Sequence, residues 1–346
     1  MKKTNLIDKH QIAIAVSGVG GGVGQSVVKA LANSNYKIIG LDGETLGTGL
    51  YVVPEAYVIP YANDPAFLSR VREICAEQKC KLFFPGMDVE LAVLARSRRA
   101  FQEVGTFVVV SNPEVIEICD DKLLTYEFLS KNNIPAPFTA ELNDLLNQKA
   151  EIPFPLIIKP KKGGARSKNV RMISSRLEIE HMLYNKNFDK DNYVAQEYLD
   201  GDEYTCGSVS FDGNCFGVIV MKRILRDGDT YKCFVERNAL INETVERIIK
   251  ALKPTGGCNV QLRMKNGIPY VFEINARCSG TTAARALAGF NEPLMIADYL
   301  IRGKKPSFSI KEISILRYWK ELVVDGDAIR ALETNGRLSN LKWAQL

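Results

Sequence analysis

The chain has 346 residues, of which 46% are hydrophobic and 25% charged, ordinary values for a globular protein that exclude disordered and fibrous classes. Its 45 Lys and Arg residues against 40 Asp and Glu give a net charge of +5, too diffuse to indicate a nucleic-acid partner. Two histidines and eight cysteines in no CxxC pair exclude a zinc site and a histidine-based catalytic triad. Without an apolar run of signal-peptide or membrane-spanning length, we expect a reduced, cytoplasmic protein with no membrane partner.

The first third of the chain alternates short apolar runs with helical segments. Strands separated by helices of this length predict a parallel sheet with crossover helices. We therefore expect one small α/β domain that ends near Asn112. Its predicted strands are 12–16, 36–41, 81–84 and 106–110, and its predicted helices are 23–32, 67–76 and 89–101.

The pattern changes beyond residue 112. A helical segment over 113–132 ends at the prolines Pro135 and Pro137, and strands dominate from Tyr193 onward. The turn dipeptides at 212–213 and 266–267 predict hairpins, so this half is expected to be α+β with an antiparallel sheet. Its predicted strands are 154–159, 170–173, 193–198, 204–211, 215–222, 259–265 and 271–275, with helices at 177–184 and 291–302.

A glycine-rich turn follows the first predicted strand. Gly18, Gly21 and Gly24 have GxxGxxG spacing, and Asp42 closes the second strand, which is the layout of a dinucleotide site. Taken literally, it predicts an NAD(P) enzyme related to short-chain dehydrogenases. Such enzymes also need a Tyr with a Lys four positions later, and none of the thirteen tyrosines has one. The other interpretation is a turn whose glycines serve tight packing.

A second glycine loop follows the strand at 154–159. Lys159 ends this strand, and the flexible segment 163–167 comes shortly after it. A lysine at a strand end before a glycine loop is suited to holding phosphate oxygens. A basic surface turn explains the same residues equally well.

Polar residues at alternate positions of two late strands are the most informative pattern. Glu273, Asn275 and Arg277 share one strand face, and Asn259 and Gln261 share a face of the strand before it. A carboxylate with two amide oxygens suits Mg²⁺, and an arginine beside them would neutralise a transferring phosphoryl group. A solvated sheet face is the alternative interpretation.

With these motifs, the chain resembles ATP-grasp proteins, closest in pattern to the large chain of carbamoyl-phosphate synthetase and related carboxylate–amine ligases. The resemblance covers Ile12 to Lys304 and is strongest between Asp121 and Gly303. It implies an α/β and α+β fold, in which a Rossmann-like pre-ATP-grasp domain precedes two lobes that hold ATP between them. The implied domains are 1–112 (Rossmann-like), 113–192 (first lobe), 193–306 (second lobe) and 307–346 (C-terminal segment).

The resemblance also implies an ATP site, position by position. Lys122 and Lys159 would contact the phosphates, and Glu203 would bind the ribose. The phosphate-covering loop would include Gly163, Gly164 and Ser167. The hinge whose backbone reads adenine would comprise Gln196, Glu197, Tyr198 and Leu199.

The same resemblance implies a metal site and a reaction. Gln261, Glu273 and Asn275 would bind one or two Mg²⁺ ions, for which Mn²⁺ can substitute, and Arg277 would stabilise the transferred phosphate. The implied activity is ATP-dependent ligation of a small-molecule carboxylate to an amine through an acyl phosphate. Positioning and charge neutralisation supply most of the rate in such a reaction.

Further residues are substrate-site candidates, each with a structural alternative. Asp88 and Glu90 would orient the amine, or complement a helix dipole. Arg223 would face the substrate carboxylate or the γ-phosphate, or be solvated at the surface. Ser279 and Gly280 would offer amides to a substrate carboxylate, or belong to a helix cap.

Three other functions compete with the ligase. They are a carbamoyl-phosphate-type phosphorylation of bicarbonate or carbamate, an NAD(P)-dependent enzyme using the glycine turn at Gly18–Gly24, and a regulatory protein that binds nucleotide without catalysis. The resemblance also implies a homodimer.

Overall fold

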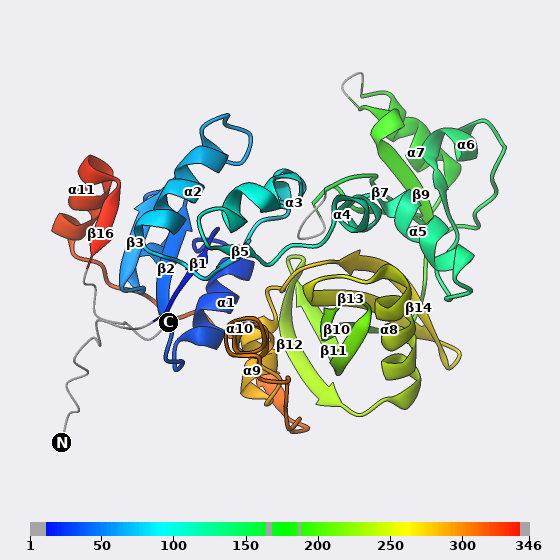
Figure 1. Cartoon of the computed structure of the whole chain (residues 1–346). Helices are drawn as coiled ribbons and strands as arrows, with labels where there is room; N and C mark the ends of the chain where they lie inside the picture. Colours follow the sequence, from blue (N-terminus) through cyan, green and yellow to red (C-terminus); the bar gives the residue numbers. More distant parts are fainter. Residues whose placement is uncertain (1–11, 164–167, 186–187, 340–346) are drawn as a thin grey trace.

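The structure, a computed structural model, describes residues 12–163, 168–185 and 188–339. Three sheets organise it, each associated with its own helices (Figure 1). Across these described residues, no helix combines the length and the apolar character that a membrane crossing requires. All eight cysteines are free thiols, and six of them are buried.

The N-terminal domain contains the predicted parallel sheet, with strand order β3-β2-β1-β4-β5, and a sixth strand from the C-terminal segment pairs antiparallel with β3. Ala13 and Ala15 of β1 pack on the side of α2 and α3, whereas Ile14 and Val16 pack with α1 on the other side. Both faces are therefore covered, which explains why the strands are continuously apolar. The elements are β1 (Ala13–Val16), α1 (Gly22–Leu31), β2 (Lys37–Asp42), a 3-10 helix η1 (Thr48–Tyr51), β3 (Glu55–Val58), α2 (Phe67–Glu77), β4 (Leu82–Phe84), α3 (Asp88–Gln102) and β5 (Phe107–Val108).

The predicted helix over 113–132 is two helices, because Asp121 leaves helical geometry and caps the second one. Its carboxylate accepts hydrogen bonds from the amides of Leu123 and Leu124. The helices are α4 (Pro113–Asp120) and α5 (Lys122–Lys131). The polar N-cap thus outweighs the nearly continuous helical pattern of apolar residues.

The first lobe has a four-stranded sheet with strand order β6-β9-β7-β8. Strand β9 pairs with both β6 and β7, so the expected boundary between residues 192 and 193 is wrong and the lobe extends through Glu197. Sequence alternation cannot tell which of two sheets a strand joins. The elements are β6 (Thr139–Glu141), α6 (Leu142–Leu146), β7 (Leu156–Pro160), β8 (Arg171–Ile173), α7 (Arg176–Leu183), a 3-10 helix η3 (Lys190–Asn192) and β9 (Tyr193–Glu197).

The second lobe has a six-stranded antiparallel sheet with strand order β14-β13-β10-β11-β12-β15. The hairpins predicted at 212–213 and 266–267 are confirmed by the pairing of β10 with β11 and of β13 with β14. Helix α8 was not predicted; its buried Ile241, Val245 and Ile248 cover one face of this sheet. The elements are β10 (Asp202–Phe211), β11 (Asn214–Arg226), β12 (Asp229–Glu236), α8 (Ala239–Leu252), β13 (Gly256–Lys265), β14 (Ile268–Asn275), α9 (Thr282–Leu287) and α10 (Glu292–Arg302).

The C-terminal segment is shared between two sheets. Strand β15 (Ser314–Leu316) joins the second lobe, whereas α11 (Gly326–Asn335) and β16 (Arg337–Ser339) lie beside the N-terminal sheet (Figure 1). Strand β16 pairs antiparallel with β3, and the buried Leu332 anchors α11 in the same apolar cluster as α1. The described part of the segment expected at 307–346, residues 307–339, therefore runs from the second lobe to the N-terminal domain.

Candidate active site

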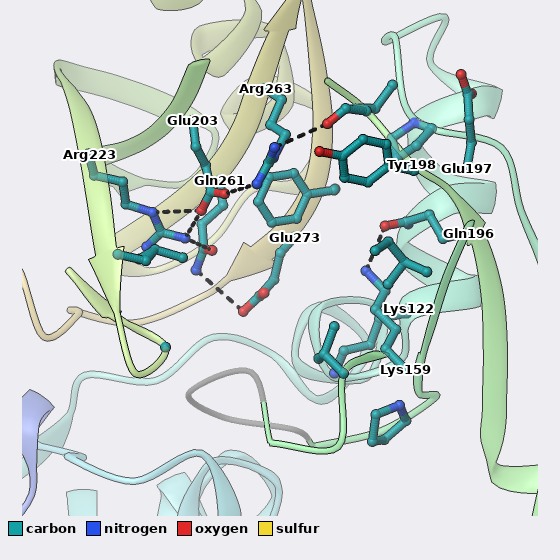
Figure 2. A pocket seen from close by; sticks show the side chains of 18 of the residues that line it. Lys122, Lys159, Gln196, Glu197, Tyr198, Glu203, Arg223, Gln261, Arg263 and Glu273 are labelled. Carbon is teal, nitrogen blue, oxygen red and sulfur yellow. Dashed lines mark hydrogen bonds and ion pairs between the residues drawn. The ribbon is translucent and has the colours of Figure 1, made fainter. Parts of the chain in front are cut away.

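A cavity of about 240 Å³ lies between the two lobes, and it gathers most of the residues expected to bind ATP (Figure 2). The first lobe and α5 contribute lysines, and strands β10, β11, β13 and β14 contribute carboxylates, arginines and an amide. Of the expected residues, the lining includes Lys122, Lys159, Gly163, Gln196, Glu197, Tyr198, Leu199, Glu203, Arg223, Gln261 and Glu273. Gly164 and Ser167, expected in the phosphate-covering loop, lie outside the described residues.

Lys159 is buried in the wall of this cavity at the end of β7. Its Nζ donates to Gln196 Oε1 at 2.9 Å, and Gln196 Nε2 donates to Thr139 Oγ1 at 2.8 Å. Burial lowers the pKa of Lys159 to about 8, although the charge of Glu273 opposes the shift. The hydrogen-bond partner of this lysine is a neutral amide and not a carboxylate, so the site favours an anionic ligand.

Lys122 lies at the start of α5, where its neighbour Asp121 caps the helix. Its Nζ donates to the carbonyl of Asp120 at 3.2 Å and also to the carbonyl of Gly163. The side chain thereby connects the first turn of α5 to the beginning of the glycine loop. Both lysines expected at the phosphates thus line one side of the cavity.

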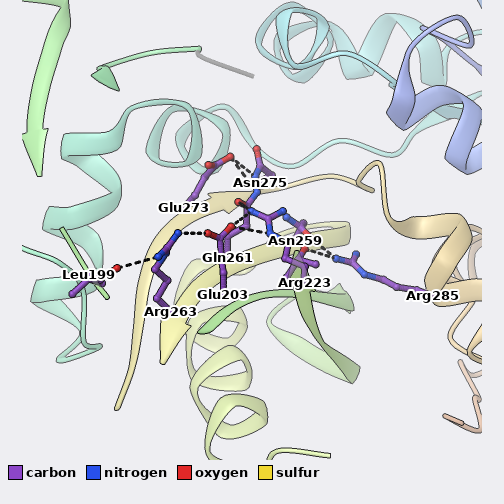
Figure 3. Close-up of polar contacts among 10 residues, drawn as sticks. Leu199, Glu203, Arg223, Asn259, Gln261, Arg263, Glu273, Asn275 and Arg285 are labelled. Atoms are coloured by element: carbon purple, nitrogen blue, oxygen red, sulfur yellow. Dashed lines mark hydrogen bonds and ion pairs between the residues drawn. The ribbon is translucent and has the colours of Figure 1, made fainter. Parts of the chain in front are cut away.

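Glu203, expected at the ribose, lies between two arginines (Figure 3). Its Oε1 accepts from Arg223 Nε at 2.9 Å and from Arg223 Nη2 at 2.6 Å, and its Oε2 accepts from Arg263 Nη2 at 2.7 Å. Arg223 lines the cavity and is not solvated at the surface, since its side chain is 10% exposed. Its guanidinium also donates to Gln261 Oε1 at 2.5 Å, and its role toward a substrate carboxylate or the γ-phosphate stays a prediction.

The side chains expected to bind metal converge on Glu273. Its Oε1 accepts from Asn275 Nδ2 at 2.8 Å and from Gln261 Nε2 at 3.4 Å. Gln261 and Glu273 line the cavity, and Asn275 lies just beyond its lining. Asn259, on the same strand face as Gln261, instead accepts from Thr205 Oγ1 at 2.8 Å and from the buried Arg285.

A β-bulge changes the expected alternation of β14. Gln261 pairs with Glu273 but Leu262 pairs with Val271, so Phe272 has no partner across the ladder. Phe272 lines the cavity next to Glu273, and its ring centroid is 5.8 Å from Lys159 Nζ. A bulge breaks the two-residue period, so alternation along the sequence does not predict that Phe272 and Glu273 both line the cavity.

Arg277 bridges the second lobe and the N-terminal domain. It donates to both carboxylate oxygens of Asp88, at 2.5 and 2.8 Å, and to Asn275 Oδ1 at 3.3 Å. Burial alone would raise the pKa of Asp88, but the Arg277 guanidinium holds it below its usual range. The first residue of α3 thus fixes the arginine that follows β14.

The other expected substrate residues are engaged within the protein. Glu90 is buried and accepts from Ser17 Oγ at 2.5 Å; burial raises its pKa to about 7, although this hydrogen bond opposes the shift. The amide of Ser279 donates to Thr282 Oγ1 at 3.0 Å, and the carbonyl of Gly280 accepts from Ser26 Oγ at 3.2 Å. Neither Glu90 nor the Ser279–Gly280 loop lines the cavity, so a substrate role for them remains a prediction.

The glycine turn after β1 is tightly packed. Asp42 Oδ2, expected at a ribose, accepts from the Gly20 amide at 2.6 Å. A Cβ on Gly24 would lie 2.2 Å from the Gly18 carbonyl oxygen, and one on Gly20 would lie 2.9 Å from the Gly47 Cα. These contacts favour the packing interpretation over a dinucleotide site.

Sequence reasoning missed several lining residues, of which Arg263 is the most important. It donates to Glu203 and also, through Nη1, to the Leu199 carbonyl at 3.1 Å. The available signal was its position two residues after Gln261 on the same strand. The remaining missed residues are Pro137, Ile157, Pro160, Val170, Leu225, Gly228 and Phe272.

A Rossmann-like domain followed in the chain by two lobes with a charged cavity between them is the arrangement expected of ATP-grasp proteins. Comparison with known families agrees: residues 189–320 match the family described as "ATP-grasp in the biosynthetic pathway with Ter operon". Residues 12–109 match the PylC-like N-terminal domain. These matches indicate an ATP-grasp domain and a PylC-like N-terminal domain in this chain, and the resemblance inferred from the sequence is confirmed.

Its relatives include ligases. A D-alanine–D-alanine ligase A of Bacillus cereus is 28% identical over 229 residues, which are 58% of this chain and 75% of that protein. A carbamoyl phosphate synthase large chain of Thermoplasma acidophilum is 24% identical over 77% of this chain but only 27% of its own length. The crystal structure of an L-amino acid ligase from Bacillus licheniformis has a TM-score of 0.66 at 19% identity, over 85% of this chain and 75% of that one.

Proposed function

We propose that the protein is an ATP-dependent carboxylate–amine ligase that forms an amide through an acyl phosphate. The observation that carries this proposal is the cavity itself, with Lys122 and Lys159 on one side and Gln261 and Glu273 on the other. Lysines that face a carboxylate–amide cluster suit a nucleoside triphosphate whose phosphates contact the lysines on one side and a metal ion on the other. One sequence relative is a D-alanine–D-alanine ligase and one structural match is an L-amino acid ligase. These names support amino acids as substrates.

The donor set fits Mg²⁺. Glu273 provides a carboxylate, and the side-chain amides of Gln261 and Asn275 lie beside it. Their nitrogens donate to Glu273 Oε1, while their oxygens, the atoms that would bind the ion, accept from Arg223 and Arg277. In the part of the chain that the structure describes, no three His, Cys, Asp or Glu side chains gather as a metal cage. Mg²⁺ shared between phosphate oxygens and one carboxylate needs no such cage. When bound, the ion would neutralise charge on the β- and γ-phosphates, and Mn²⁺ can take the same ligands.

The reaction needs no covalent nucleophile from the protein. A substrate carboxylate oxygen attacks the γ-phosphorus while the bond to the bridging oxygen of ADP breaks, and ADP leaves. The neutral amine then attacks the acyl carbon, inorganic phosphate leaves, and the nitrogen loses a proton. Lys122 and Lys159 bind phosphates, and Arg277, held by Asp88 and Asn275, stabilises charge on the transferred group.

The substrate side of the proposal places the carboxylate and amine near Arg277. Asp88 reaches this arginine from the N-terminal domain, and the Ser279–Gly280 loop follows it in the chain. Asp88, Glu90, Ser279 and Gly280 are the residues proposed to act on substrates. We also propose a homodimer, which light scattering of the purified protein tests directly.

The test is an ADP-release assay over pairs of amino acids and small carboxylates with amines. We expect ADP release that requires MgATP, a carboxylate and an amine, and Glu273→Gln should reduce turnover at least 100-fold because the only carboxylate of the donor set is lost. Glu243→Gln is the matched control, since Glu243 is exposed on α8, outside the cavity lining. ADP release without any acceptor, or full activity of Glu273→Gln, would contradict the proposal; release with bicarbonate alone would indicate carbamoyl-phosphate-type chemistry.

A further inference from the structure

The last residues of β13 hold the connection between the two lobes. Arg263 donates to the Leu199 carbonyl at 3.1 Å, and Lys265 Nζ lies 3.3 Å from Glu197 Oε1. Between them, Met264 approaches so closely that a Cβ on Gly201 would lie 2.0 Å from its carbonyl oxygen. Three consecutive residues of one strand therefore contact the last residue of β9 in the first lobe and the segment that links it to β10 of the second.

Arg263 also contacts Glu203, the second residue of β10. Its two terminal nitrogens donate to different partners. Nη1 donates to the Leu199 carbonyl, and Nη2 donates to Glu203 Oε2. A planar guanidinium holds two acceptors in one defined geometry, which a lysine cannot do. Arg263 is partly buried, with 30% of its side chain exposed, and Glu203 is 11% exposed. The contact is therefore partly shielded from solvent.

The two carboxylate oxygens of Glu203 differ in how many further hydrogen bonds they can accept. Oε1 already accepts two hydrogen bonds from Arg223, whereas Oε2 accepts one, from Arg263. Each carboxylate oxygen has about two lone-pair sites, so Oε2 is the oxygen able to accept another donor. A ligand hydroxyl that binds Glu203 would bind the oxygen that Arg263 orients.

We propose that Arg263 is a positioning residue that makes the nucleotide site selective for ribose over deoxyribose. It holds Glu203 Oε2 and the Leu199 carbonyl in one arrangement, so that a ribose hydroxyl meets an oriented acceptor next to the adenine-reading backbone. The inference rests on the proposed function, since it assumes that the cavity binds ATP. Gln261, two residues earlier on the same strand face, is one of the residues proposed to bind the metal ion. Strand β13 therefore contributes both to the proposed metal site and to the proposed ribose site.

Equilibrium binding of ATP, 2′-deoxy-ATP and 3′-deoxy-ATP to the full chain, measured by calorimetry, tests this proposal. The wild type should bind ATP at least about tenfold more tightly than one of the deoxy nucleotides, because a hydrogen bond to a charged acceptor is lost. Arg263→Ala should reduce this preference to below about threefold. If Arg263 had only a structural role, Arg263→Ala would weaken the binding of all three nucleotides equally and leave the ratio of their affinities unchanged.

Two further variants keep the test decisive. Arg263→Gln retains a donor for Glu203 and should keep part of the preference even if Arg263→Ala fails to fold. Arg226→Ala is the matched control, because Arg226 is 60% exposed on β11 and outside the cavity. A wild-type preference that survives in Arg263→Ala or Arg263→Gln at full size, or a wild type without any preference, overturns this inference and leaves the ligase proposal intact. A folded wild type that binds no ATP overturns both.

Discussion

Single residues in the cavity obtain their chemistry from their immediate partners. Lys159 is buried beside a neutral amide, Glu203 lies between two arginines, and Arg277 is held by Asp88. In each case the charge of the side chain was evident from the sequence, but its partner was not. The pKa of Lys159, lowered to about 8 by burial, follows from this environment alone.

Lys159 should take up a proton when ATP binds. With a pKa of about 8 the free lysine is half neutral at pH 8, and the phosphates would raise its pKa and keep it charged. Calorimetry in two buffers of different ionisation enthalpy should give about half a proton taken up per ATP at pH 8, and less at pH 6.5. ATP affinity should fall as the pH rises above 8.

Lys159→Arg provides the comparison, because arginine stays charged and should abolish the lysine's share of the uptake. Lys162→Arg, on an exposed side chain two residues beyond β7, should behave as the wild type. Equal proton uptake in the wild type and Lys159→Arg would show that Lys159 is already charged in the free protein.

At the scale of elements, strand alternation predicted much of the site. The prediction that Glu273, Asn275 and Arg277 share a face is confirmed, because each contacts the next. The bulge at Phe272 and the cap at Asp121 were not predicted: a bulge depends on the register with the neighbouring strand, and the cap competes locally with a helical pattern. Strand β9 joined the other sheet because pairing partners lie far apart in sequence.

The turn between β9 and β10 yields a stability prediction. Gly201 has a φ of 130°, and a Cβ there would lie 2.0 Å from the Met264 carbonyl oxygen. Gly201→Ala should therefore lower the free energy of unfolding by about 3 kcal/mol and weaken ATP binding, because the backbone of β13 or of the hinge must move. Urea unfolding and ATP binding measure the two effects.

Gly267→Ala is the matched control for this variant. Gly267 has a φ of 77° in the β13–β14 hairpin, but no atom lies within 4 Å of the added Cβ. Gly267→Ala should lower the free energy of unfolding by about 1 kcal/mol, from the strained backbone conformation alone. Similar losses for both variants would mean that the hinge adapts to the added Cβ at no cost.

At the scale of the whole molecule, contacts between domains complete the arrangement. Asp88 and Arg277 join the N-terminal domain to the second lobe, and Ser26 of α1 bonds to the loop before α9. The C-terminal segment links the same two parts, through β15 at one end and β16 at the other. None of these long-range contacts has a local pattern from which it could be predicted.

The C-terminal segment should stabilise the N-terminal domain. Leu332 of α11 is fully buried, so Leu332→Ala should lower the free energy of unfolding by about 2–5 kcal/mol through the cavity it leaves. Leu316→Ala, on a side chain that is 65% exposed in β15, should change it by less than about 0.5 kcal/mol. Thermal unfolding followed by circular dichroism compares them, and equal effects would refute an anchoring role for α11.

The sequence by itself determined the fold class, the two halves of the chain and the residue types of an ATP-grasp site. It did so because the periods of strands and helices and the spacing of glycines, lysines and carboxylates are local properties. Only the tertiary structure decided which charges meet: Arg263 with Glu203, Arg277 with Asp88, and Glu90 with Ser17. Such contacts join residues 60 or more positions apart, and they depend on how separate sheets and helices pack rather than on any pattern along the chain.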